Sequence, residues 1–167
     1  DVHLCFAVGD VSGKGIPASL LMAITRTLLR ARTAPDMKPC QITSSINIEL
    51  CRENDNAMFV TFFIGIVNLK TGQLDYCNAG HNRPWVLDSN GAISQLPQTH
   101  GTPLGLFDDM KYGCSSVVLG KGSSVVLYTD GVTEAMNSQG ELFGDEQLIE
   151  ALRACNGAPP KQIISEV

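Results

Sequence analysis

The chain has 167 residues, which is enough for one domain with a sizeable buried core. Hydrophobic residues make up 44% and charged residues 17%, a balance that argues against an intrinsically disordered chain. The formal net charge of −5, without any basic run, argues against broad binding to nucleic acids or anionic membranes, and no apolar stretch is long enough to insert into a bilayer.

The first third of the sequence predicts one strand and two helices. A continuous apolar run at residues 4–8 indicates a strand that is buried on both faces. Pro17 suits the first turn of a helix, and apolar residues recur behind it at helical spacing, which predicts a helix over about 16–32. A second apolar stripe with a polar far side predicts another helix over about 39–54.

From residue 58 onward the apolar pattern becomes that of strands. Three successive strand pairs, each around a Gly-containing turn, are predicted at 58–69 with 73–79, 85–88 with 92–96, and 115–119 with 124–128. Asp145 suits the N-cap of a following helix that ends near Asn156-Gly157, and Pro159-Pro160 starts a last helix. Hairpin-joined strands beside segregated helices predict an α+β fold.

The cysteines are scattered and form no C-x-x-C pair. Most of them lie in apolar or helical contexts, so we expect reduced core or surface residues and neither a disulfide framework nor a zinc cluster. The six residues concerned are Cys5, Cys40, Cys51, Cys77, Cys114 and Cys155.

Two carboxylates follow predicted strands directly. Asp10 ends the first apolar run, and Asp130 follows the run Val-Val-Leu-Tyr-Thr and precedes Gly131. Each residue by itself is interpreted as a turn or cap residue. Two converging acids at the edge of a core, where an unpaired charge is costly, are better explained by shared cations. Oxygen ligands without a nearby His or Cys suit Mg²⁺ or Mn²⁺ better than zinc.

The glycine-rich turn at residues 9–18 invites two nucleotide-binding interpretations. A P-loop needs four residues between its first glycine and a Gly-Lys pair, then Ser or Thr, whereas this chain has three residues there and then Gly15. The pattern Gly13-x-Gly15-x-x-Ala18 fits a dinucleotide fingerprint, which requires a second parallel strand ending in an acid. Because the chain runs into a second helix instead, a nucleotide-binding α/β domain is the weaker hypothesis.

His81 and Cys77 are the remaining candidates for chemistry. His81 is interpreted as a metal ligand, a general acid or a satisfied turn histidine, and we favour the last. Cys77 near His81 suggests a thiol nucleophile, but its alternation with Tyr76 in a strand favours a buried structural cysteine. A Ser–His–Asp hydrolase lacks a nucleophile, because the sequence contains no Gly-x-Ser-x-Gly elbow.

Four ordered segments resemble the PPM-type (protein phosphatase 2C-like) serine/threonine phosphatases, in the bacterial branch of sporulation stage II protein E and RsbU-like enzymes. The first segment, residues 9–23, reads Gly-Asp-Val-Ser-Gly-Lys-Gly-Ile-Pro-Ala-Ser-Leu-Leu-Met-Ala. The others are Tyr-Cys-Asn-Ala-Gly-His-Asn-Arg-Pro at 76–84, Gly-Thr-Pro-Leu-Gly-Leu at 101–106 and Leu-Tyr-Thr-Asp-Gly-Val-Thr-Glu-Ala at 127–135, followed by Phe143-Gly144.

This resemblance implies an α/β/β/α sandwich with two central antiparallel sheets flanked by helices, formed by residues 1–167 as a single phosphatase domain. It implies hydrolysis of phosphoserine or phosphothreonine with two Mn²⁺ or Mg²⁺ ions. By position, Asp10 would bridge both metals, the Val11 carbonyl would bind one of them, and Asp130 would bind the other, so that both acids are catalytic. A metal-bridging water would attack phosphorus in line, without a phosphoenzyme.

The resemblance also implies partners and a location. The expected substrate is a phosphorylated regulator, such as an anti-sigma-factor antagonist, in the cytoplasm. An upstream sensor or receiver domain is expected to act through the helix at about 16–32, and a homodimer is compatible with the resemblance. Neither nucleic-acid binding nor direct membrane insertion is expected. The alternative function is a non-catalytic or truncated phosphatase-like module that docks a partner.

Both ends of the sequence lack natural caps. The family's pattern includes a metal-binding Asp on a strand upstream of Gly9 and an Asp-Asp-x-Thr strand beyond Val167, so we expect both edge segments to lie outside this sequence. We therefore expect the segment alone to bind metal weakly and to be poorly active, and its parent protein to be active.

Overall fold

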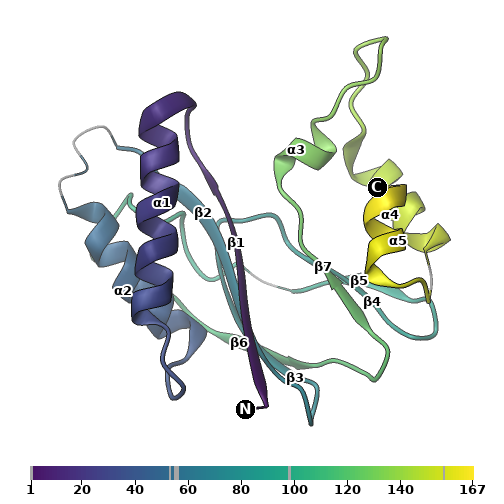
Figure 1. The fold of residues 1–167 in the computed structure, drawn as a ribbon, viewed down its shortest axis with the longest axis horizontal. Coiled ribbons are helices and arrows are strands. Elements are labelled where there is room, and N and C mark those ends of the chain that lie inside the picture. The colour runs from purple at the N-terminus through teal and green to yellow at the C-terminus, as the bar shows by residue number, and fades with distance from the viewer. Residues whose placement is uncertain (1, 53, 55–56, 98, 156) are drawn as a thin grey trace. The chain divides into compact units, whose positions relative to one another are not determined.

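The computed structural model describes residues 2–52, 54, 57–97, 99–155 and 157–167, in two compact units (Figure 1). The first unit comprises residues 1–81 and 98–118, and the second comprises 82–97 and 119–167. The first contains β1 (His3–Val11), α1 (Gly15–Arg32), α2 (Pro39–Cys51), β2 (Val60–Asn68), β3 (Gln73–Ala79) and β6 (Ser115–Val118). The second contains β4 (Trp85–Leu87), β5 (Ile93–Gln95), β7 (Ser124–Val126), α3 (Asp130–Thr133), α4 (Gly144–Ala154) and α5 (Pro160–Glu166).

The first unit is a four-stranded antiparallel sheet, in the order β1-β2-β3-β6, with α1 and α2 packed on one face (Figure 1). Alternate residues of a strand project to the same face, and residues at i, i+4 and i+8 of a helix form one stripe. The core accordingly joins Val60, Phe62 and Ile64 of β2 to Ile42, Ile46 and Leu50 of α2. Each such buried side chain contributes about 1.5–3 kcal/mol to stability.

The opposite face of this sheet carries a row of stacked aromatic rings. The ring centroids of Phe6 and Phe63 are 6.3 Å apart, and those of Phe63 and Tyr76 are 5.7 Å apart. Gly65 makes room for the row, because a Cβ at this position would lie 2.6 Å from the Phe6 ring. The period of two along β2 therefore separates the core face under the helices, which includes Phe62, from the face that carries the stacked rings.

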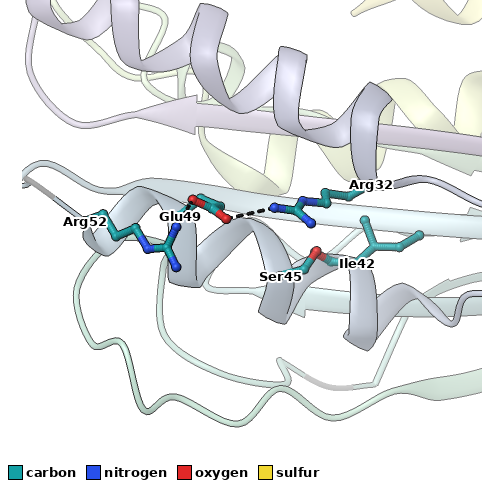
Figure 2. A network of polar contacts seen from close by, with 5 residues as sticks. All are labelled: Arg32, Ile42, Ser45, Glu49 and Arg52. Atoms are coloured by element: carbon teal, nitrogen blue, oxygen red, sulfur yellow. Dashed lines mark hydrogen bonds and ion pairs between the residues drawn. The ribbon is translucent and has the colours of Figure 1, made fainter.

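The last turn of α1 is tied to α2 by a small charged network. One Glu49 carboxylate oxygen accepts a hydrogen bond from Arg32 and the other accepts one from Arg52, each at 2.8 Å (Figure 2). Because both arginine side chains are largely exposed, each pair is worth only up to about 1 kcal/mol. The helices are therefore held mainly by their apolar contacts with the core, and the charged network adds little.

The second unit is a three-stranded antiparallel sheet, in the order β5-β4-β7, with α3, α4 and α5 following it in the chain. Its core contains Leu87 of β4, Tyr128 and three helical residues, Leu148, Leu152 and Ile163. Leu148 and Leu152 lie one turn apart on α4 and are fully buried, which is the helical periodicity that predicted this element.

The predicted α+β fold, with two antiparallel sheets and helices, is confirmed. The hairpins β2–β3 and β4–β5 form as predicted, α2 begins at Pro39, and α5 begins at Pro160. All strand pairs between the named strands of the described residues are antiparallel, and α1 leads into α2 without an intervening strand. The βαβ unit required by the dinucleotide hypothesis is therefore not formed in the described residues.

Three local predictions are wrong. The strands at 115–119 and 124–128 do not pair with each other, because β6 joins β3 in the first sheet and β7 joins β4 in the second. The first strand is not buried on both faces, because residues 3–5 of β1 are exposed and residues 6–11 are only partly buried. Asp145 lies inside the first turn of α4, where Phe143 is the N-cap. The predicted end of this helix at Asn156 lies outside the described residues.

The prediction that all cysteines are reduced is also wrong in this structure. Cys40, in the first turn of α2, forms a disulfide with Cys114, and their Cα atoms lie 5.4 Å apart. The bond joins positions 74 residues apart, and no local sequence pattern indicates such a long-range pair. Among the residues described, no helix combines the length and apolar character that crossing a membrane requires.

Candidate functional site

Asp10 lies near the end of β1, directly opposite Thr61 of β2 in the antiparallel register. Opposed residues of an antiparallel pair project to the same face, so Asp10 and Thr61 share the aromatic face of the sheet, away from α1 and α2. The Asp10 side chain is half-buried, and its Oδ1 accepts a hydrogen bond from the Val11 N–H at 3.0 Å. The predicted carboxylate and carbonyl ligands therefore belong to consecutive residues at one strand end.

Thr61 links this strand end to His81. The Thr61 hydroxyl lies 3.3 Å from the Asp10 carbonyl oxygen, to which it donates, and 2.9 Å from Nδ1 of His81. The His81 backbone is held in turn by the Asn78 side chain, which donates to the His81 carbonyl at 3.0 Å and accepts from its N–H at 2.8 Å. His81 is thus a buried turn histidine, 3% exposed, with its ring directed at the candidate site.

His100 extends this polar chain on the other side of Asn78. Its Nδ1 accepts a hydrogen bond from the Asn78 N–H at 3.0 Å, which leaves Nε2 to donate to the Ser115 hydroxyl at 2.7 Å. Burial lowers the pKa of the His100 imidazole. A neutral His100 therefore fixes Asn78, and Asn78 fixes the turn that carries His81.

The turn after Asp10 has the conformation that its glycines predict. Gly13 and Gly15 both lie in the left-handed region, with φ of 84° and 77°. Ser12 closes the strand end against β2, because its N–H donates to the Phe59 carbonyl and its hydroxyl accepts from the Phe59 N–H, both at 2.9 Å. The helix α1 begins directly after this turn, so its unpaired first N–H groups come within a few residues of Asp10.

Asp130 belongs to the second unit, where it forms the first turn of the short helix α3. Its backbone carbonyl accepts a hydrogen bond from the Glu134 N–H at 2.7 Å, and its side chain is exposed. The exposure removes the argument that Asp130 sits as a costly unpaired charge at a core edge. Each unit is considered separately, so the expected convergence of Asp10 with Asp130 stays a prediction.

The oxygens at Asp10 and Val11 fit a hard divalent cation in their chemistry. Within the ranges described, no group of three or more His, Cys, Asp or Glu residues that could hold a metal is found. The described residues therefore supply part of a ligand set for Mg²⁺ or Mn²⁺.

Cys77 is unsuited to the alternative role of thiol nucleophile. It is fully buried in the core under α2, and this burial raises the pKa of the thiol to about 11. Because the thiolate is the nucleophile, a thiol that stays protonated at neutral pH is inert. Cys77 is therefore a structural core residue, as the alternation with Tyr76 predicted.

Sequence reasoning missed Thr61 and Asn78 as supports of the site, and Asn47 as a support of the loop at residues 105–107. Asn47 is fully buried on α2, where its amide bonds to the Phe107 carbonyl and the Gly105 N–H at 2.8 and 2.9 Å. The available signal for Asn47 was a polar residue next to the apolar stripe of a helix. Asn78 stands in the segment Asn-Ala-Gly-His, whereas Thr61 carried no signal beyond its place in a strand.

Comparison with known proteins identifies the fold as that of a PP2C-like phosphatase domain. The SiaA PP2C domain of Pseudomonas aeruginosa superposes with a TM-score of 0.81 at 19% identity, over 98% of this chain and 70% of that one. The RsbU and RsbW domains of a Mycobacterium tuberculosis protein give 0.81 at 24%, over 97% and 46%. RsbX, solved in complex with magnesium, gives 0.74 at 21%, over 99% and 72%.

The family follows from the sequence itself. Residues 1–167 match the family described as Stage II sporulation protein E (SpoIIE), and the chain belongs to that family. The phosphoserine phosphatase RsbU of Bacillus subtilis is 31% identical over 136 residues, 81% of this chain and 41% of RsbU. Protein IcfG of Synechocystis is 30% identical over 182 residues, 92% of this chain and 28% of IcfG. The chain thus spans less than half the length of either relative.

Proposed function

We propose that this chain is the catalytic domain of a Mg²⁺- or Mn²⁺-dependent protein serine/threonine phosphatase. The observation that carries the proposal is the match of residues 1–167 to the SpoIIE family, in which the relative RsbU is named a phosphoserine phosphatase. The magnesium bound to RsbX, a protein of the same fold, supports the choice of a hard divalent cation.

Asp10, Val11 and Asp130 are the proposed ligands of two ions. When bound, such ions would lower the pKa of a coordinated water and neutralise the oxygens of the phosphoryl group. Asp10 offers its carboxylate from a strand end that β2 holds on one side. The left-handed Gly13 and Gly15 let the backbone turn tightly beside it, and the unpaired N–H groups at the start of α1 favour an anionic substrate.

The proposed substrate is a phosphorylated regulator of the anti-sigma-factor antagonist class. The similarity to RsbU, and to a structure that joins RsbU and RsbW domains, supports this class. The proposal places the domain in the cytoplasm, in a longer protein whose sensor or receiver domain acts through α1. It also treats residues 1–167 as one phosphatase domain built from both units.

The decisive test is phosphatase activity of the natural full-length protein on a phosphoserine peptide, with Mn²⁺ or with EDTA. Removing a mere partner of a metal ligand costs 10- to 100-fold, so Asp10→Asn and Asp130→Asn should each lower activity by more than about 100-fold. Asp109→Asn, in an exposed loop of the first unit, is the matched control and should leave activity unchanged. Equal activity with Mn²⁺ and EDTA would refute the metal-dependent mechanism.

A non-catalytic module that docks a phosphorylated partner is the second candidate. It is favoured by the absence of a three-residue acidic or histidine cluster from the ranges that the structure describes. The same experiment separates the two functions, because a docking module would bind the phosphopeptide stoichiometrically and release no phosphate from it in the presence of Mn²⁺.

A further inference from the structure

The hydroxyl of Thr61 stands between His81 and the candidate ligand Asp10. It lies 2.9 Å from Nδ1 of the histidine and 3.3 Å from the Asp10 carbonyl oxygen. That carbonyl belongs to the peptide bond between Asp10 and Val11, which are the two proposed ligands of the first unit. The N–H of this same peptide, that of Val11, donates to the Asp10 carboxylate at 3.0 Å, so the orientation of the peptide bears directly on the placement of that carboxylate.

Counting hydrogens assigns the roles in this contact. The Thr61 hydroxyl has one hydrogen, and the Asp10 carbonyl can only accept, so the hydroxyl donates to Asp10. The contact with His81 is then a hydrogen bond only if Nδ1 carries a hydrogen and donates to the Thr61 oxygen. Both interactions are satisfied at once by the Nδ1–H form of His81.

The histidine is anchored independently of Asp10. The side chain of Asn78, itself fully buried, bonds both to the N–H and to the carbonyl of His81. The Asn78 backbone is fixed on both sides, because its N–H donates to His100 Nδ1 and its carbonyl accepts from the His100 N–H at 2.6 Å. His81, which contacts Thr61, is therefore held in place by buried hydrogen bonds that do not involve Asp10.

We propose that His81 is a positioning residue that acts through Thr61 to orient the Asp10–Val11 peptide, whose N–H holds the Asp10 carboxylate for binding a divalent cation. The inference rests on the proposed function for its cation and on the structure for its contacts. Positioning matters here because the end of β1 leads within two residues into a left-handed turn. Groups behind a metal ligand often control its orientation and affinity in this way.

The first test compares Thr61→Val with Thr61→Ser in the natural full-length protein. Valine keeps the β-branched shape and loses the hydroxyl, whereas serine restores the hydroxyl. We expect Thr61→Val to weaken Mn²⁺ binding, measured by calorimetry, by roughly 10-fold, and to raise the Mn²⁺ concentration for half-maximal activity equally. The KM for the phosphopeptide should not change, and Thr61→Ser should restore affinity to within about 3-fold.

Thr43→Val is the matched control. The Thr43 hydroxyl is also buried and donates to a backbone carbonyl, that of Pro39, at 2.8 Å, but it lies on α2 in the helix-covered core. This variant should lose stability without losing Mn²⁺ affinity. If Thr61→Val fails to fold, Thr61→Ala, which also lacks the hydroxyl, is compared with Thr43→Ala, and only the former should weaken Mn²⁺ binding. Equal Mn²⁺ affinity of wild type and Thr61→Val would overturn the inference.

Two measurements test the pathway from His81. In the Thr61→Val background, His81→Asn should cause no further loss of Mn²⁺ affinity, because the residue acts through the missing hydroxyl. Additive losses would show a separate role of His81 and contradict the inference. The ¹⁵N chemical shifts of the His81 ring should identify the Nδ1–H tautomer in wild type. An Nε2–H tautomer would contradict the inference, because Nδ1 could then not donate to Thr61.

The outcomes separate this inference from the proposed function. A wild-type protein that binds no Mn²⁺ refutes the metal site, and the NMR measurements then decide the positioning by themselves. In that case, an Nδ1–H tautomer with a shifted Val11 amide resonance in Thr61→Val supports the positioning of the peptide. An unshifted resonance overturns it. Mn²⁺ binding that is insensitive to Thr61 and His81 leaves the proposed function standing and removes the inference.

Discussion

Replacing the buried Asn47 by alanine should destabilise the first unit strongly. The Asn47 side chain donates to the Phe107 carbonyl at 2.8 Å and accepts from the Gly105 N–H at 2.9 Å, and it is fully buried. Alanine leaves both backbone groups without these partners, and each buried orphan costs about 1–3 kcal/mol. The expected loss is therefore about 2–6 kcal/mol, a large fraction of the roughly 5–15 kcal/mol that stabilises a typical domain.

Urea unfolding followed by far-UV circular dichroism gives the change in the free energy of unfolding. Amide exchange at Gly105 adds a local readout, because its N–H is the donor that loses its acceptor. The control is Gln73→Ala, which removes an exposed amide whose bond to Asp75 is 3.1 Å long. It should change the free energy of unfolding by less than about 0.5 kcal/mol.

A loss below about 1 kcal/mol for Asn47→Ala, with Gly105 still protected from exchange, would refute this reasoning. It would mean that the loop around Gly105 finds other partners or water when the amide is gone. The loop is part of the segment 101–106, so the result also measures how firmly that segment is held.

Three further predictions concern the cysteines and a histidine. Reducing the Cys40–Cys114 disulfide opens a loop of 74 residues and should lower the free energy of unfolding by about 4 kcal/mol, which Cys114→Ser should reproduce; an unchanged urea midpoint after reduction would contradict this. Because burial raises the pKa of Cys77 to about 11, native protein at pH 8 should resist alkylation there, whereas denatured protein should react, as peptide mass mapping can show. Because burial lowers the pKa of His100, the unfolded state binds more protons just below pH 6.5, so stability should be full above about pH 6.5 and fall as the pH drops through that value. His100→Gln should flatten this part of the stability–pH curve, and an equally steep curve in the variant would assign the loss to other groups.

The elements that depend on local pattern could be predicted from the sequence. The limits of β3 and the start of α2 follow from period-two alternation, glycine turns and the place of Pro39. The assignment of β6 and β7 to different sheets could not be predicted in this way, because two alternating segments around a short glycine turn look the same whether or not they pair. β6 and β7 pair with the edges that β3 and β4 leave free, and the position of those edges depends on residues far away in the sequence.

In the candidate site, too, the local features could be predicted from the sequence and the long-range contacts could not. Asp10, Val11 and the glycine turn are consecutive, so one sequence segment was enough to predict a strand end followed by a left-handed turn. The structure has both features at these residues. The assignment of Asp10, Val11 and Asp130 as ligands stays a prediction. Thr61 and His81 reach Asp10 from 51 and 71 positions away along the chain, a nearness that only the β1–β2 register and the turn at Gly80 create.

The two units interleave along the chain, and this has a consequence for synthesis. Residues 82–97 of the second unit are made before residues 115–118, which form the edge strand of the first. During synthesis on a ribosome, residues 82–97 of the second unit are therefore made while Tyr76 of β3 still lacks its strand partner Ser115. The sheet of the first unit therefore cannot be completed before residues 115–118 have been translated. A single proteolytic cut, likewise, cannot separate the two units, because any fragment that holds all of one unit also holds part of the other.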